Sequence, residues 1–483
     1  MATYSAYEHF GWLARVAPAF KVDGDKVEVL QDPVQFYERL KSEILRARQR
    51  VVLASLYLGT GKLEEDLVSC LHEACERSAL EQTNQLDVRI LLDYNRGTRG
   101  ATSSCTMLLP LVQQFNDSVQ VALYHSPDLR GFLKWILPER FNETISLSHL
   151  KVYLFDDVLI MSGANLSDSY FTNRQDRYIV LRDCSQLADF FSHLVSAVSS
   201  LSFRLNADNT ITWNDDLPCH PFKDNDDGTR YKEEARRRLS PLLDPETYSG
   251  TTANSSIESS SVDTKDTDTD TDTDTLVYPL VQMGPFGISV DDFVTRQLLQ
   301  TSPAGSQICL ASGYFNLTDH YIAAILDSSK SNYNIVTASP EANGFFQAHG
   351  MSGGIPPAYT LIARTFWHQV CARCLQQRVR LCEFSRPGWT FHGKGLWYYL
   401  PSYSLPSLTF IGSPNFGYRS VFRDLEAQVA IVTTNTKLQQ QLHEEQKSLF
   451  DKSTEVTSET FTQPDRAVPL WVTIVIAFIK TYF

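Results

Sequence analysis

The chain carries two copies of one polar pattern, each built from residues that take part in phosphate chemistry. In each copy a lysine follows a histidine by two positions, and an asparagine and a carboxylate come later. The members are His149, Lys151, Asn165 and Asp176 in the first copy and His392, Lys394, Asn415 and Glu426 in the second. The interval from the asparagine to the carboxylate is the same in both copies. Core packing gives no reason to repeat such polar spacing, so the repeat predicts one site made of two half-sites.

Each of these residue types has a role in the transfer of a phosphate-linked group. An imidazole can attack phosphorus as a nucleophile, and a second imidazole can move the proton of the leaving or accepting group. Lysine and asparagine can hold the non-bridging oxygens, where charge gathers in the transition state. A carboxylate on the far ring nitrogen fixes the tautomer of the imidazole. The pattern therefore predicts transfer through a phosphohistidine, a mechanism that requires no metal ion or other cofactor.

The segments around the two copies also resemble each other and predict the elements that position them. Short apolar strands are expected at VVLASLYLGTG (51–61) and ICLASGYFNLT (308–318), each followed by a helical stretch and a second strand. The histidine and lysine of each copy are expected on a later strand, where side chains two apart share a face. The alternation predicts an α/β fold, with two duplicated mixed-sheet halves packed around one shared active site.

Composition divides the chain into two halves and a linker. Residues 214–276 are rich in Asp, Ser and Thr and contain the run TDTDTDTDT, so we expect an acidic, disordered linker there. The first half is expected at 1–213, with its motif at 149–156. The second half is expected at 277–483, with its motif at 392–394 and an apolar C-terminal segment.

The charge and the cysteines argue against several kinds of protein. A net charge of −13 disfavours a nucleic-acid binder, which would present a broad basic surface. The nine cysteines are scattered and odd in number, as in a chain with reduced thiols. Cys371 and Cys374 form a CxxC pair, but no second ligand pair stands at a zinc-site spacing. No metal site is therefore expected.

The two ends of the chain bear on targeting and on membranes. The N-terminal stretch has no long apolar run, so a secretory signal is not expected, and no clear transit peptide is visible. The apolar run 468–479 (VPLWVTIVIAFI) is shorter than the ~20 residues that a spanning helix needs. It is either a buried final element or an interfacial anchor, with Trp471 at the level of the lipid headgroups.

The first copy resembles the signature of the phospholipase D superfamily, in which HxK is followed by an Asp and then by a Gly/Ser–Asn turn. Asp156 and the turn SGAN (162–165) match it, as does the turn GSPN (412–415) of the second copy. The second copy has Tyr399 where the signature has its Asp. We count Asp156 with the catalytic residues, although the resemblance implies that it is largely a structural anchor.

Longer segments are similar to those of eukaryotic mitochondrial phosphatidylglycerophosphate synthases. SGANLSDSYFTNRQDRY, ASPEANGFF and IGSPNFGYRSVFRDLEAQ carry this resemblance, which covers most of the chain outside the linker. It implies transfer of the phosphatidyl group of CDP-diacylglycerol to glycerol 3-phosphate, on the way to phosphatidylglycerol and cardiolipin. It also implies a mitochondrial location and peripheral contact with the inner membrane.

The same resemblance assigns roles to the members of the two copies. His149 is expected to attack the phosphatidyl phosphorus while CMP leaves, and His392 is expected to activate the acceptor hydroxyl. The reverse assignment stays open, because the two copies are nearly symmetric. The lysines and asparagines are expected to hold phosphate oxygens. Asp176 and Glu426 are each expected to orient the histidine of their own copy.

Glycerol 3-phosphate brings a second anionic group, so further cations are expected near the site. The candidates follow a first-half strand or lie beside the two Gly/Ser–Asn turns. They are Arg96, Arg99, Arg177 and Arg419, with Arg174 and Arg423 nearby and Ser413 within the second turn.

Two other functions are alternatives at this point. A phospholipase D-type phosphodiesterase would form the same phosphohistidine but use water as the acceptor. A non-catalytic membrane scaffold would keep the fold and lose its half-sites. Both His–Lys pairs are intact, which disfavours the scaffold.

Overall fold

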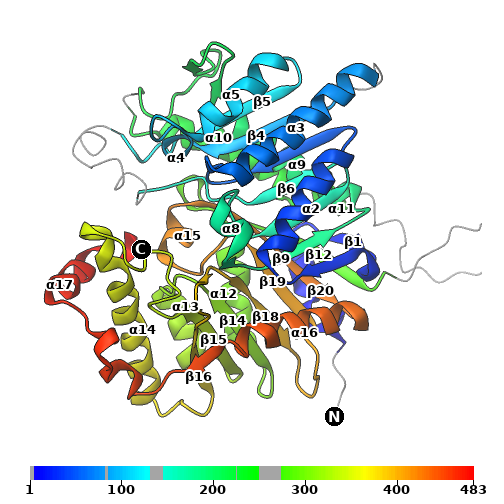
Figure 1. Cartoon of the computed structure of the whole chain (residues 1–483). Coiled ribbons are helices and arrows are strands. Elements are labelled where there is room, and N and C mark those ends of the chain that lie inside the picture. Colours follow the sequence, from blue (N-terminus) through cyan, green and yellow to red (C-terminus); the bar gives the residue numbers. More distant parts are fainter. Residues whose placement is uncertain (1–4, 82–84, 131–144, 225, 250–272, 483) are drawn as a thin grey trace, which may run out of the picture.

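Two large mixed β-sheets form the centre of the molecule, and helices cover their faces (Figure 1). The structure is a computed structural model that describes residues 5–81, 85–130, 145–224, 226–249 and 273–482. The first half of the chain builds one sheet, and the second half builds most of the other.

The two sheets share one strand order. In the first sheet it is β2 (Val27–Leu30), β9 (Tyr178–Leu181), β7 (Val158–Ser162), β6 (Val152–Phe155), β3 (Arg50–Ala54), β4 (Asp87–Asp93), β5 (Val119–Tyr124), β10 (Phe203–Leu205) and β11 (Ile211–Thr212). In the second it is β12 (Thr275–Met283), β20 (Leu425–Thr433), β19 (Leu408–Gly412), β18 (Lys394–Tyr399), β14 (Gln307–Ser312), β15 (Asn332–Ala338), β16 (Val379–Phe384) and β21 (Ser453–Glu455). β3–β5 run parallel to one another, as do β14–β16. This match confirms the predicted duplication of an α/β unit.

The central strands read as unbroken apolar runs because both of their faces are covered. Every residue of β6 (VYLF) is buried, and so is every residue of β19 (LTFIG). Strands buried on two sides do not alternate between apolar and polar residues. The segments predicted as the first strand of each half form β3 and β14.

Helices form three layers around and between the sheets (Figure 1). The outer face of the first sheet packs against α2 (Pro33–Arg46), α3 (Lys62–Glu81) and α5 (Ser104–Gln114). The outer face of the second packs against α12 (Val290–Thr301), α13 (Asp319–Ala323) and α14 (Ile355–Ala372). The inner faces of both sheets share one core with α9 (Ser185–Ser199), α10 (Thr229–Leu243) and α16 (Thr436–Phe450). The two halves therefore bury a common core.

Several segments cross from one half to the other. β1 (Phe20–Val22) pairs with β12, so the N-terminal residues lie on the second sheet rather than within the predicted first half. In the opposite direction, Gln441 of α16 accepts a hydrogen bond from the amide of Val29 in β2 over 3.0 Å. A small parallel sheet joins β8 (Arg174–Gln175) to β17 (Thr390–Phe391).

The predicted linker contains ordered structure. α10 and α11 (Pro245–Ser249) fall within residues 214–276, so the prediction of a disordered linker is wrong for residues 229–249. Tyr231, Ala235 and Leu239 recur every four residues, lie on one face of α10 and are fully buried. The many charged residues between them conceal this apolar stripe from a compositional argument. Residues 250–272 lie outside the described part of the chain.

The C-terminal apolar run forms the helix α17 (Leu470–Ile479), which packs against α14 (Figure 1). Val472 and Ile476 are buried, whereas Leu470 and Phe478 are 76% and 80% exposed. Part of the helix therefore packs into the core, as the first predicted alternative has it, and the rest is an apolar surface; the interfacial anchor stays a prediction. Of the helices in the described ranges, none has the length and apolar character needed to cross a membrane.

Candidate active site

Each His-x-Lys segment runs beside a strand of the opposite half. The amide of His149 donates to the carbonyl of Leu425 over 2.9 Å. In the matching contact, the amide of His392 donates to the carbonyl of Gln175 over 2.7 Å. Both acceptor residues stand directly before the carboxylate of their own copy. The backbone therefore brings the histidine of one half to the carboxylate of the other.

The side chains complete this exchange between the halves. His149 Nδ1 lies 2.9 Å from Glu426 Oε2, and His392 Nδ1 lies 2.6 Å from Asp176 Oδ2. The prediction that each carboxylate orients the histidine of its own copy is therefore wrong. The interval from asparagine to carboxylate is the same in the two copies, so this spacing does not distinguish the two pairings. An Nδ1–H bond to a carboxylate fixes the tautomer and leaves Nε2 with its lone pair.

The backbone of each histidine holds the lysine that follows it two positions later. Of the strands predicted to carry the lysines, β18 begins at Lys394 and β6 begins one residue after Lys151. Lys151 Nζ donates to the carbonyl of His149 over 2.9 Å, and Lys394 Nζ donates to the carbonyl of His392 over 2.7 Å. Both lysines are fully buried. Lys394 also lies 3.5 Å from Asp176 Oδ2. The ammonium groups are thus fixed beside both imidazoles.

Burial shifts the pKa values of the site in a way that suits an anionic ligand. Burial lowers the pKa of Lys151 to about 7, and burial also lowers the pKa of Lys394. Burial, with the nearby Lys394 and Arg174 cations, lowers the pKa of His392 well below its ordinary value. Burial lowers the pKa of His149 to about 4, although the Glu426 carboxylate acts in the opposite direction. A bound phosphate would offset this excess of desolvated cations.

Asn165 and Asn415 end the Gly/Ser–Asn turns that follow β7 and β19. The amide oxygens of Asn165 and Asn415 are buried and have no hydrogen-bond partner in the described part of the chain. The oxygen and nitrogen of an amide exchange places by rotation, so either asparagine can offer its NH₂ group to a phosphate oxygen. An unpartnered buried polar group of this kind marks a place for a ligand.

The two half-sites differ at the fifth residue after each asparagine. That residue is Tyr170 in the first half, and its hydroxyl lies 3.3 Å from His392 Nε2. It is Ser420 in the second half, where the hydroxyl instead donates to Glu426 Oε1 over 2.7 Å. His149 Nε2 makes no hydrogen bond to the described residues. The sequence-based prediction missed both hydroxyls, although their equal spacing from the asparagines was a usable signal.

Comparison with known proteins gives the family. No protein-family model matches the chain. The chain is 51% identical over 485 residues to the mitochondrial CDP-diacylglycerol–glycerol-3-phosphate 3-phosphatidyltransferase of Gallus gallus, covering 98% of this chain and 86% of that protein. The chain belongs to this phosphatidyltransferase family. Its human relative is 50% identical over 481 residues, with the same coverage. The Saccharomyces cerevisiae relative is 33% identical over 94% of this chain and 88% of its own length.

A solved structure supports the fold of this phosphatidyltransferase. The phosphatidylserine synthase of Haemophilus influenzae superposes with a TM-score of 0.68 and 17% identity, over 99% of this chain and 98% of that one. The likeness confirms the predicted α/β fold of two duplicated mixed-sheet halves.

Two predicted site residues have structural roles instead. The Asp156 carboxylate accepts hydrogen bonds from the amides of Arg48, Gln49 and Arg50 over 2.8–3.0 Å, so it anchors the start of β3 rather than acting in catalysis. Its backbone has φ 49°, a conformation that Asp tolerates better than most residues.

Arg177 is not a substrate-binding residue either. Its fully buried guanidinium makes two 2.9 Å hydrogen bonds to Glu445 of α16 and stacks 3.7 Å from the ring of Trp397. It also donates to the carbonyl of Phe410 over 2.7 Å. These bonds use the donors that a phosphate would need. Arg177 therefore links the segment between β8 and β9, which carries Asp176, to the second half.

The other predicted binding residues are described by their own contacts. Arg419 pairs with Asp424 over 3.1 Å, and its Nε is buried and unpartnered within the described ranges. The Ser413 hydroxyl bonds the backbone of Ala427. Arg96 lies 4.4 Å from the ring centroid of Tyr57. Arg99 is half-buried just beyond α4 (Tyr94–Gly97).

A further cation lies on the His392 side. Arg174 stacks 4.7 Å from the ring centroid of Tyr170 and donates to the Thr390 hydroxyl over 3.1 Å. Arg174 thus reaches the half-site of His392 through the ring of Tyr170. In the part of the chain that the structure describes, no group of three His, Cys, Asp or Glu side chains could hold a metal ion.

The anchoring role of Asp156 predicts a loss of stability. D156A removes the acceptor of three backbone hydrogen bonds and should lower the free energy of unfolding by about 1–3 kcal/mol in urea titrations. D157A is the matched control, because the Asp157 side chain is 54% exposed and pairs only with Arg50 in the described structure, so its effect should stay below about 1 kcal/mol. Phosphatidyl transfer per folded molecule should not change in either variant. Lost transfer in a fully stable D156A protein would contradict the anchor.

Proposed function

We propose that the composite site transfers the phosphatidyl group of CDP-diacylglycerol to glycerol 3-phosphate in two steps, with His149 as the nucleophile. The relatives carry the name of this transferase, and the chain has both half-sites in a paired arrangement. The Nε2 atoms of the two histidines have different surroundings, and this difference favours His149 as the nucleophile. This atom carries no hydrogen bond to described residues in His149, whereas it contacts the Tyr170 hydroxyl in His392.

In the first step, His149 Nε2 forms a bond to the phosphatidyl phosphorus and the bond to the oxygen of CMP breaks. Its Nδ1–H stays bonded to Glu426, which stabilises the positive charge that develops on the ring. The leaving oxygen belongs to a phosphate and needs little protonation. Lys151, Lys394 and the two asparagines surround the non-bridging oxygens and hold their charge.

In the second step, a hydroxyl of glycerol 3-phosphate attacks the same phosphorus and the P–N bond to His149 breaks. The hydroxyl proton passes to His392 Nε2, which is unprotonated because burial lowers the pKa of this imidazole. The acceptor hydroxyl would take the place of the Tyr170 hydroxyl at this nitrogen. Arg174 or Arg419 would bind the phosphate of the acceptor bidentately. All groups in this scheme are side chains, so no metal ion is part of it.

The lipid substrate and the names of the relatives also suggest where the reaction occurs. The relatives are named as mitochondrial proteins. We therefore place the enzyme in the mitochondrion, in peripheral contact with the inner membrane, where a diacylglycerol substrate is held.

The transferase activity predicts a defined product. Purified protein with CDP-diacylglycerol and labelled glycerol 3-phosphate should form labelled phosphatidylglycerophosphate and an equal amount of CMP, measured by lipid extraction and nucleotide chromatography. Leaving out glycerol 3-phosphate should stop sustained CMP release, because the phosphoenzyme has no acceptor. Formation of phosphatidic acid as the only lipid product would overturn the proposal.

The two histidines predict opposite trapping behaviour. With CDP-diacylglycerol labelled at its phosphatidyl phosphorus, H392A should accumulate acid-labile label on the protein, because the acceptor has lost its base. H149A should take up no label, and transfer should fall roughly 100-fold or more in both variants. H193A, on the exposed side of α9, is the control and should match the unmodified protein. Label on H149A and none on H392A would reverse the assignment.

A further inference from the structure

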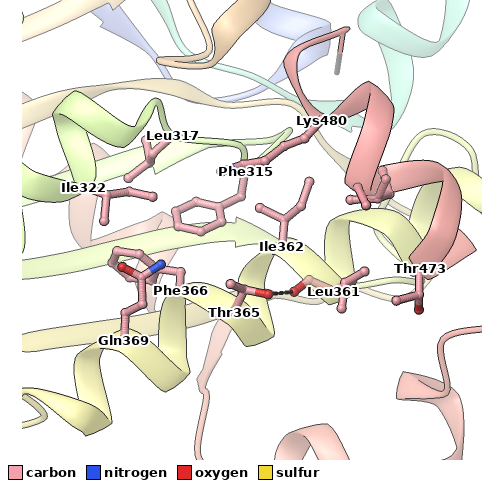
Figure 2. Close-up of a pocket in the computed structure, with 12 residues that line it drawn as sticks. Phe315, Leu317, Ile322, Leu361, Ile362, Thr365, Phe366, Gln369, Thr473 and Lys480 are labelled. Carbon is pink, nitrogen blue, oxygen red and sulfur yellow. Dashed lines mark hydrogen bonds between the residues drawn. The ribbon is translucent and has the colours of Figure 1, made fainter.

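A pocket of about 210 Å³ lies between α14, α17 and the loop that follows β14 (Figure 2). Its walls are largely apolar, with Phe315 and Leu317 from the loop, Ile362 and Phe366 from α14, and Ile476 from α17. Such a lining excludes an ionic or sugar ligand from the interior of the pocket, because buried polar groups need partners. An apolar chain fits it.

The loop after β14 lies between this pocket and the active site. Tyr314 points to the reaction centre, where its ring centroid lies 5.4 Å from that of His392. The next residue, Phe315, lines the pocket and packs edge-on against Phe366 at 5.2 Å. α14 makes the same link, because Tyr359 packs against Tyr314 at 5.4 Å and lies one turn before Ile362. The pocket and the site thus share two walls.

A charged residue of the pocket wall is held in an ion pair. Lys480 lines the pocket where η8 (Lys480–Tyr482) begins, and its ammonium lies 3.2 Å from Asp319 and 5.3 Å from the ring centroid of Tyr418. Because this ammonium is paired with Asp319, it leaves the interior of the pocket apolar, as an acyl chain needs. The chain as a whole has a net charge of −13, so this cation is a local feature.

The outer face of α17 places this pocket at an apolar surface. Leu470, Trp471, Ile474 and Phe478 are 76%, 46%, 54% and 80% exposed, all on one ten-residue helix. Exposed apolar residues gathered in this way mark a contact with a lipid or protein surface. A lipid drawn from such a surface would pass α17 to reach the pocket.

We infer that the pocket between α14 and α17 binds one acyl chain of the lipid substrate while its phosphate lies between the two histidines. This inference rests on the proposed function, because it assigns the pocket to the CDP-diacylglycerol of that reaction. The loop after β14 then contacts the substrate at two places, with Tyr314 near the phosphate and Phe315 beside the acyl chain.

A pocket-filling substitution tests this assignment. A477W adds bulk to an exposed residue of the α17 wall, and I474W places a tryptophan one turn away, outside the pocket. The ratio of kcat/KM for CDP-dioleoylglycerol to that for CDP-dihexanoylglycerol is measured in mixed micelles. A477W should lower this ratio about tenfold, the loss of contact with roughly two methylene groups. I474W should leave it unchanged.

A second variant guards against local damage to α17. T365W fills the pocket from the α14 wall, and H368W is its exposed control on the same helix. An unchanged ratio in A477W and T365W, or an equal loss with both lipids, would overturn the inference. So would weaker binding to phosphatidylcholine vesicles with an unchanged ratio, since the pocket would then hold a bilayer lipid instead. If the unmodified protein forms no phosphatidylglycerophosphate from either lipid, the proposed function itself fails.

Discussion

The exchange of carboxylates between the two halves is the interaction on which the rest of the structure depends. Glu426 and Asp176 are almost fully buried, and a buried carboxylate is costly unless it is paired. Each finds its partner imidazole in the opposite half. Neither half can therefore satisfy its own buried charges. The shared core between the two sheets holds the halves in an arrangement that completes both pairs.

The near two-fold arrangement is broken at a few positions, and these give the half-sites different chemistry. Tyr170 and Ser420 occupy equivalent places after the two asparagines, yet one contacts an imidazole and the other a carboxylate. A two-step transfer needs such a difference, because one histidine must bond to phosphorus while the other moves a proton. Ser420 bonds Oε1 of Glu426, and His149 bonds Oε2 of the same carboxylate.

Local patterns in the sequence predicted much of the fold and the identity of the central side chains. The apolar runs of the strands and the spacing of His, Lys and Asn are properties of short segments, so no tertiary knowledge was needed. The pairing of His149 with Glu426 depends instead on contacts across 277 positions, which spacing does not encode. Arg177 was predicted to bind substrate because its true partner, Glu445, lies 268 positions away in the sequence, where spacing does not reveal it. α10 was missed because three buried residues were outnumbered by charged ones.

The central claim is tested most directly by nuclear magnetic resonance of the two histidines in protein labelled with ¹⁵N at histidine. Glu426 stabilises the imidazolium form of His149, so E426Q should shift its Nδ1 resonance and lower its pKa further below the ordinary value. The resonances of His392 should stay in place, whereas D176N should move them and leave His149 unchanged. A shift of His149 in D176N with none in E426Q would show that each half orients its own histidine, and would contradict the exchange.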